Sequence, residues 1–288
     1  MDWLFLLIQT LNGIQYGLLL FLIASGLTLV FGIMGIINLA HGSFYMIGAY
    51  LAFSFTQMTG SLPLAIILGI PVTLVLGLVI EKFFIVHLYH RDHLQQVLLT
   101  FGLILIFNEL QLIIWGGDPN GVPIPQALSG SVPISDTLSY PVYRIFLSVA
   151  CLVIAGLLAF VIQKTRLGMR VRAGASNREM TETLGINIRL LYAVVFSVGV
   201  TLAGVAGMLA APVETVYPGM GEQILIISFV VVVIGGIGSV KGAFLGALAI
   251  GLVDVYGQVY LPEIASVAVY ALMAAVLLWR PAGLFGRS

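Results

Sequence analysis

The sequence predicts an all-α polytopic membrane protein with a single transmembrane domain over residues 1–288. Hydrophobic residues make up 60% of the chain and charged residues 8%, and the mean hydropathy is +1.12. One soluble core cannot bury that much apolar surface. Only helices and closed barrels satisfy their backbone groups in lipid, and the uninterrupted apolar runs lack the alternation of barrel strands. We therefore expect a bundle of eight to ten transmembrane helices with broken or re-entrant segments.

The apolar runs give nine candidate spans, and a helix needs roughly 20 residues to cross the bilayer. They lie at 13–32, 36–57, 62–80, 96–115, 142–162, 190–211, 223–240, 243–261 and 264–279. If 36–57 is one complete span, Met1 lies outside; if it is re-entrant, eight spans remain and Met1 lies inside. Residues 3–10 can also form a short interfacial helix, because Trp3 favours that depth. The sequence leaves these alternatives open.

The only sizeable charged block is 163–189, which interrupts two apolar runs and holds six of the twelve Lys and Arg residues. Its basic excess predicts the cytoplasmic side of the membrane. Successive loops lie on alternate sides of the membrane, so counting spans from this block in both directions places the loops near 81–95, 235–242 and 280–288 on the same side. Every basic residue except Arg144 is then cytoplasmic, and so is the C-terminus.

The second half of this block has the signals of a short helix. Ser176 or Asn177 can act as the N-cap, Glu179 and Glu182 lie in the early turns, and Gly185 offers a left-handed stop. A capped helix displayed beside the membrane indicates a docking element. The alternative is an ordinary positively charged loop.

The longest external connection, 116–141, is rich in Gly and Pro in its first half, which predicts an ordered loop rather than a helix. It is either a surface that meets a substrate-delivering partner or gates an entrance, or a long connector.

A weak repeat at an offset of 200 residues suggests two related halves. The matching residues are Gly35, Ile37, Gly42 and Phe44 with Gly235, Ile237, Gly242 and Phe244. Both segments join two apolar runs at a glycine-rich break.

Four polar residues fall within apolar runs and are candidates to line a translocation path. Asn38 and His41 lie one helical turn apart among glycines, where they either face a water-filled cavity or bond neighbouring backbone in close helix packing. Glu109 and Asp254 are the acids deepest within apolar runs. They either line the path or make hydrogen bonds between helices, and a proton-coupled secondary transporter would use such a carboxylate as a relay.

Several function classes have no support in the sequence. No phosphate-binding loop occurs, so the chain is not expected to bind or hydrolyse ATP, and no nucleophile elbow or zinc-protease helix occurs. The single Cys151 excludes an intrachain disulfide, and zero net charge argues against nucleic acid. We expect no catalytic residues, no metal site and no cofactor on this chain.

Three blocks taken together resemble the permease family of branched-chain amino acid ABC importers, LivH type. They are GLTLVFGIMGIINLAHG at 26–42, RLGMRVRAGASN at 166–177 with LGIN at 184–187, and GGIGSVKGA at 235–243. The resemblance implies a bacterial cytoplasmic-membrane subunit. It would pair with a second homologous permease, two cytoplasmic ATPase subunits and a periplasmic substrate-binding protein.

In this family the region that matches 163–189 is a coupling segment seated on the ATPase. The resemblance implies that closure of the ATPase pair pushes this segment and exposes a central cavity to each side in turn. Arg172, Asn177, Glu179 and Glu182 would serve that coupling, and Gly185 would end the helix. The substrate would be a branched-chain or other hydrophobic amino acid, with urea or a short amide as the alternative.

Overall fold

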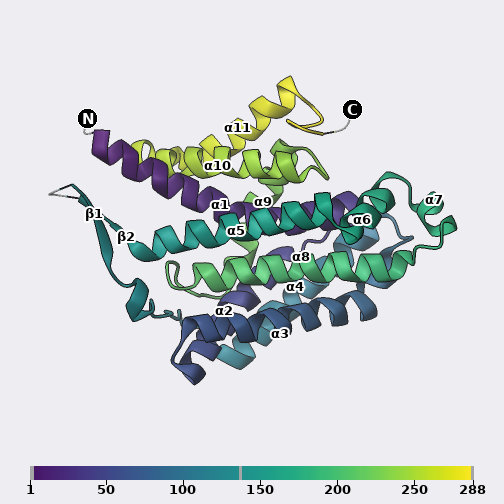
Figure 1. Ribbon diagram of the computed structural model, residues 1–288, viewed down its shortest axis with the longest axis horizontal. Helices are drawn as coiled ribbons and strands as arrows, with labels where there is room; N and C mark the ends of the chain where they lie inside the picture. The colour runs from purple at the N-terminus through teal and green to yellow at the C-terminus, as the bar shows by residue number, and fades with distance from the viewer. Residues whose placement is uncertain (1–2, 136–137, 287–288) are drawn as a thin grey trace.

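The computed structural model describes residues 3–135 and 138–286, and these are predominantly helical (Figure 1). Seven helical segments are long and apolar enough to cross a membrane, which confirms a polytopic membrane protein. They are α1 (Trp3–Met34), α3 (Leu62–Phe83), α4 (His93–Trp115), α5 (Val142–Lys164), α8 (Ile188–Ala210), α10 (Val240–Tyr260), and η3 (Pro262–Ile264) continued by α11 (Ala265–Trp279).

The remaining elements are either short or form the helical part of a crossing that is broken inside the bundle. They are α2 (His41–Thr59), η1 (Ile85–Leu88), η2 (Gln126–Leu128), β1 (Ser131–Ser135), β2 (Leu138–Pro141), α6 (Arg166–Ser176), α7 (Arg178–Thr183) and α9 (Met220–Gly235). The β1–β2 hairpin lies at one end of the bundle and α7 at the other (Figure 1). We name these the hairpin end and the α7 end. Helix α1 begins toward the hairpin end, and the described chain ends toward the α7 end (Figure 1).

The connection 116–141 is partly as predicted. Its first half is mostly irregular, with a single bridge between Asn120 and Val216 and the short 3-10 helix η2. Its second half forms the antiparallel hairpin, in which Val132 pairs with Tyr140. The sequence reasoning did not predict this hairpin.

Helix α1 is the centre of the bundle. It carries no charged side chain. In its most apolar 18-residue stretch 89% of the residues are buried, whereas 17% are buried in the corresponding stretch of α5. A helix that is hydrophobic all round is expected to be surrounded by other helices or by lipid. Residues 3–10 continue α1 without a break, so the separate interfacial helix allowed by the sequence does not form.

The chain unwinds after α1 and turns back into the bundle. Gly35 ends α1 in a left-handed conformation (φ +66°), and the Ile37 N–H donates to Oε1 of Gln96 at the start of α4. His41 then lies with Nε2 2.9 Å from the carbonyl oxygen of Ile23. Ile23 precedes the end of α1 by about 16 Å at the helical rise per residue. Helix α2 therefore begins inside the bundle.

The stretch 36–57 nevertheless completes a crossing. Helix α2 runs on to the hairpin end, where the indole of Trp115 at the end of α4 donates to Oγ of Ser54 at 2.6 Å. Because the first part of this crossing is unwound and the second part helical, the structure has the predicted broken segment. It also places the start of α1 opposite the α7 end, as expected if 36–57 is a complete span, while Met1 itself lies outside the described residues.

A second broken crossing joins α8 to α10. After α8 ends at the hairpin end, the chain passes Val216, which is bridged to Asn120, and re-enters the bundle. Helix α9 begins where Gly221 packs directly against Gly42 of α2. It then runs to the α7 end, where Gly235 packs against Gly242. The N-terminal ends of α2 and α9 thus meet in the interior.

Two helix triplets, α1–α2–α3 and α8–α9–α10, have the same build and run in opposite directions. Each consists of a long helix, an unwound stretch, a helix that starts inside the bundle, and an antiparallel return. Helix α1 packs along α10 as α8 packs along α3, and α1 crosses α8 where Gly26 meets Gly199. The two related halves are therefore present. The predicted offset of 200 residues is wrong. The equivalent helices α2 and α9 start at His41 and Met220, which are fewer than 200 residues apart in the sequence.

Glycines permit the closest approaches in this core. A Cβ on Gly48 of α2 would overlap the carbonyl oxygen of Gly204 in α8, and one on Gly207 would overlap that of Tyr45. By contrast, Gly102 of α4 has no atom within 4 Å of such a Cβ.

We expect Gly48→Ala to lower the free energy of unfolding by about 1–3 kcal/mol, because an inserted methyl group forces packed backbones apart. Gly102→Ala is the matched control and should leave stability unchanged or raise it slightly. Thermal unfolding in detergent measures both. Equal stability of the two variants would contradict the close α2–α8 packing.

Candidate functional site

Helix α7 has the caps that its sequence predicts. Asn177 is the N-cap, with its Oδ1 accepting from the N–H of Met180 at 2.9 Å, so Ser176 is not the cap. Gly185 follows the helix with φ +84°, and its N–H donates to the carbonyl of Glu182 at 2.9 Å. The expected left-handed stop is confirmed.

The neighbouring helices are capped in the same way. Thr165 accepts from the N–H of Gly168 at the start of α6, and Asn187 accepts from the N–H of Leu190 at the start of α8. Every helix start between α5 and α8 is thus fixed by a side chain of the preceding residue. The segment is an ordered structure, which a docking element requires.

The predicted coupling residues divide into two groups. The guanidinium of Arg172 turns back and donates to the carbonyl oxygen of Ile162 in the last turn of α5. In this structure Arg172 joins α6 to α5. From the exposed residues of α7 and its two flanks we define the α7 surface by Asn177, Glu179, Met180, Glu182 and Leu184. Met180 and Leu184 are 60% and 73% exposed, so this surface combines two acids with two large apolar side chains.

Arg178 anchors α7 to the bundle, a role that the sequence reasoning missed. Its guanidinium carbon lies 5.4 Å from the ring centre of Tyr192 in α8 and 6.0 Å from that of Tyr89. The Tyr89 hydroxyl donates to the carboxylate of Glu81 in the last turns of α3. Burial and this hydrogen bond raise the pKa of the Tyr89 phenol, which therefore stays protonated as a donor. The chain of contacts links α7 to both α3 and α8.

Asn38 and His41 are completely buried at the first broken crossing. His41 is held at the Ile23 carbonyl, and the amide of Asn38 has no hydrogen-bond partner in the described structure. Neither lines a cavity described below. Glu109 is exposed on α4, beside Asn108, whose amide donates to Oε1 of Glu222 in α9 at 2.8 Å.

Of the four predicted path residues, Asp254 lines one of the two cavities described here. This first cavity, of about 310 Å³, lies between α1, α10, the start of α5 and the loop 211–219. Its lining residues are Asn12, Gln15, Tyr16, Leu19, Arg144, Leu147, Ala210, Val213, Glu214, Asp254, Val255 and Gln258. A second cavity of about 370 Å³ is lined by Tyr16, Tyr45, Glu214, Thr215, Tyr217, Met220, Gln223, Ile224 and Ile227. Tyr16 and Glu214 belong to both.

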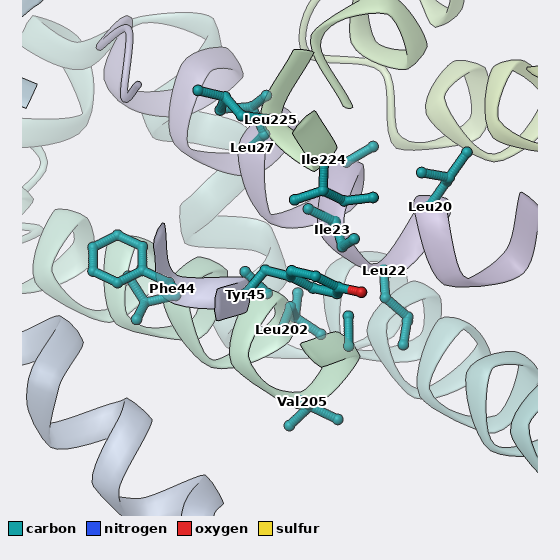
Figure 2. Close-up of a cluster of buried hydrophobic side chains, with 14 of the residues drawn as sticks. Leu20, Leu22, Ile23, Leu27, Phe44, Tyr45, Leu202, Val205, Ile224 and Leu225 are labelled. Atoms are coloured by element: carbon teal, nitrogen blue, oxygen red, sulfur yellow. The ribbon is translucent and has the colours of Figure 1, made fainter. Parts of the chain in front are cut away.

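The wall between the cavities is fixed by a hydrogen bond between distant parts of the chain. Tyr45 of α2 donates its hydroxyl to Oε2 of Glu214 at 2.8 Å. Its ring is packed among apolar side chains that include Ile23, Leu202 and Ile224 (Figure 2). The hydroxyl is therefore the only polar atom that the Tyr45 side chain offers to the cavities.

Glu214, Tyr45 and Arg144 were not among the predicted site residues. Glu214 lies in the short break APVETVYP at 211–218, whose two prolines signal that the apolar run stops there. Arg144 was the one basic residue left on the outer side by the charge distribution. Both signals were available in the sequence, but neither shows which residues the fold brings together.

Seven continuous spans, two crossings broken in the bundle interior and two cavities with ionisable walls define an integral membrane transport protein. The chain matches the family described as the branched-chain amino acid transport system permease component over residues 9–277. It belongs to this family, whose members are transport components and not enzymes.

Three relatives show the extent of the similarity. BraD of Pseudomonas aeruginosa PAO1 is 36% identical in an alignment that is 296 residues long, gaps included, and covers 97% of this chain and 95% of BraD. LivH of Escherichia coli K12 is 31% identical over 301 residues, with 99% and 97% covered. LivM of the same strain is 28% identical over 295 residues, with 91% and 67% covered. All three are named as high-affinity branched-chain amino acid transport system permease proteins. No solved structure matches the chain.

We expect Arg178→Ala to loosen α7, because cation–π contacts are worth about 0.5–1 kcal/mol at exposed sites. Backbone hydrogen exchange of residues 178–183 should rise by up to about fivefold, the factor equivalent to about 1 kcal/mol. Arg170→Ala, at an exposed position of α6, is the control. Unchanged exchange in Arg178→Ala would contradict the anchoring role.

Proposed function

We propose that this chain is the permease subunit of an ATP-driven importer of branched-chain or other hydrophobic amino acids in a bacterial cytoplasmic membrane. The observation that carries the proposal is the similarity to BraD and LivH over nearly the whole length of each chain. The transport class follows from family membership, and the substrate class follows the names of these relatives. The two cavities offer a route through the outer half of the bundle.

The energy source in this proposal is a separate pair of ATPase subunits, since the sequence has no phosphate-binding loop. The α7 surface is their docking site, with Glu179 and Glu182 as polar contacts and Met180 and Leu184 as apolar ones. With the ATPases docked on this surface, the α7 end and the C-terminus would lie in the cytoplasm. A periplasmic binding protein then delivers substrate at the hairpin end.

A second homologous permease completes the proposed assembly. LivH and LivM of E. coli K12 are both relatives of this chain and carry the same transport-system name, which favours pairing of two different permeases. Glu109 and Glu222 are exposed on neighbouring helices at membrane depth, where acids face water or another protein rather than lipid. We assign this face of α4 and α9 to contact with the second permease.

The structure suggests how movement would reach the path. Force on α7 passes through Arg178 to Tyr192 of α8 and, through Tyr89 and Glu81, to α3. Helices α3 and α8 pack along each other and against α2, whose unwound start carries Asn38 and His41. Closure of the ATPases would rock this group against α1 and α10 and open Asp254 and its cavity to each side in turn.

Two substitutions test the coupling. Gly185→Pro should abolish ATP-driven uptake, because proline cannot adopt φ +84° and removes the N–H that bonds Glu182. Glu182→Arg should do the same by reversing a charge on the α7 surface. Both proteins should still reach the membrane. Glu263→Arg, at an exposed acid of η3 toward the hairpin end, is the control.

Uptake into vesicles that contain the full set of subunits measures the outcome. Unchanged ATP-driven uptake in both variants would remove the docking role. Uptake by this chain alone with a proton gradient and no ATPase would overturn the proposed function in favour of a secondary transporter.

Orientation is tested by single cysteines. Cys151 is buried, so the background is silent toward membrane-impermeant thiol reagents. Thr183→Cys should react only from the cytoplasmic side and Val132→Cys only from the outside. The opposite pattern would leave the ATPases without a docking site.

A further inference from the structure

The first cavity combines both signs of charge with an apolar wall. Arg144 supplies a guanidinium, and Glu214 and Asp254 supply carboxylates. Leu19, Leu147, Val213 and Val255 supply aliphatic surface in the same cavity. The volume of about 310 Å³ falls in the range of pockets that hold small ligands.

The charged groups of this cavity are bonded to neutral partners. Arg144 Nη1 donates to Asn12 Oδ1 at 2.7 Å, and Asp254 Oδ2 accepts from the Gln258 amide at 2.7 Å. Glu214 accepts from the phenol of Tyr45. Each of these bonds orients a charge without neutralising it. A half-buried charge that has only neutral partners favours a ligand group of the opposite charge.

A neutral ligand would not use this arrangement. Urea or a short amide has no full charge to place against Arg144, Glu214 or Asp254. A simple cation would be repelled by Arg144, and a simple anion by the two acids. An amino acid at neutral pH carries one carboxylate and one ammonium group, and a branched aliphatic side chain fits the apolar wall.

We propose that this cavity receives the amino acid as its zwitterion. Arg144 binds the carboxylate, Glu214 and Asp254 bind the ammonium group, and the aliphatic wall holds the side chain. This inference rests on the proposed function and adds the recognising residues and the charge state of the substrate.

Glu214 also explains how the substrate would advance. Because Glu214 faces both cavities, the ammonium group keeps one carboxylate partner while the rest of the molecule moves from the first cavity to the second. Among the described residues, none that lines the second cavity is basic, so the carboxylate loses its partner on passing Tyr16. The guanidinium of Arg144 therefore acts at entry, and Glu214 acts throughout.

Protection of single cysteines tests the site separately from uptake. Val213→Cys and Val255→Cys place a thiol in the cavity lining, and Val132→Cys on the hairpin is the control. The full chain is labelled with a small thiol reagent in membrane vesicles that also hold its partner subunits. Leucine should slow labelling at both cavity positions and leave Val132→Cys unaffected. Leucinamide, which lacks the carboxylate, and 4-methylpentanoate, which lacks the ammonium group, should protect neither.

Removing either charge should weaken the protection. In the Val213→Cys and Val255→Cys backgrounds, Arg144→Gln or Glu214→Gln should raise the leucine concentration for half-protection by about 10- to 100-fold, as expected for a lost hydrogen bond to a charged group. Glu263→Gln, at the exposed acid of η3, should leave it unchanged. Using two cavity positions means that failure of one variant to fold does not end the test.

The overturning results are distinct. Unreactive cysteines at both cavity positions, no protection by leucine, or equal protection by leucinamide would each refute the zwitterion site. ATP-driven leucine uptake without protection refutes the site and leaves the proposed function in place. Protection that depends on Arg144 and Glu214 without ATP-driven uptake keeps the site and refutes the proposed function.

Discussion

The meeting of α2 and α9 in the bundle interior is the contact on which the rest of the structure depends. A backbone that unwinds within a membrane must satisfy its polar groups without lipid contact, so it has to be enclosed by protein. The glycine contact between Gly42 and Gly221 brings the two helix starts together with no side chain between them. Both unwound stretches are thereby held next to the most buried helices, α1 and α8. The cavities lie where this arrangement leaves room toward the hairpin end.

The same contact joins the two regions of the chain to which we assign function. On one side of it, Tyr45 reaches Glu214 and closes the wall between the cavities. On the other side, α2 packs on α8 and α3, which hold α7 through Tyr192, Tyr89 and Glu81. A movement at the α7 end can therefore alter the cavity wall through packed helices alone.

The features predicted correctly from the sequence are those that depend on local chemistry. Apolar run length predicts the spans, and the side chain of Asn177 and the backbone freedom of Gly185 predict the ends of α7. The bond from Arg172 to Ile162 was not predicted, because it depends on how α6 folds back on α5, and the coupling role of Arg172 stays a prediction. Glu214 and Tyr45 are far apart in the chain and meet only through the second broken crossing. The repeat register was wrong because inverted halves share helix geometry, while local glycine patterns recur wherever helices pack closely.

The opposite directions of the two triplets have a mechanical consequence. If α1–α2–α3 and α8–α9–α10 hold slightly different shapes, each half can adopt the shape of the other. In the proposed importer, such an exchange would turn a passage open at the hairpin end into one open at the α7 end. The shape of each half would then be a guide to the second shape of the other.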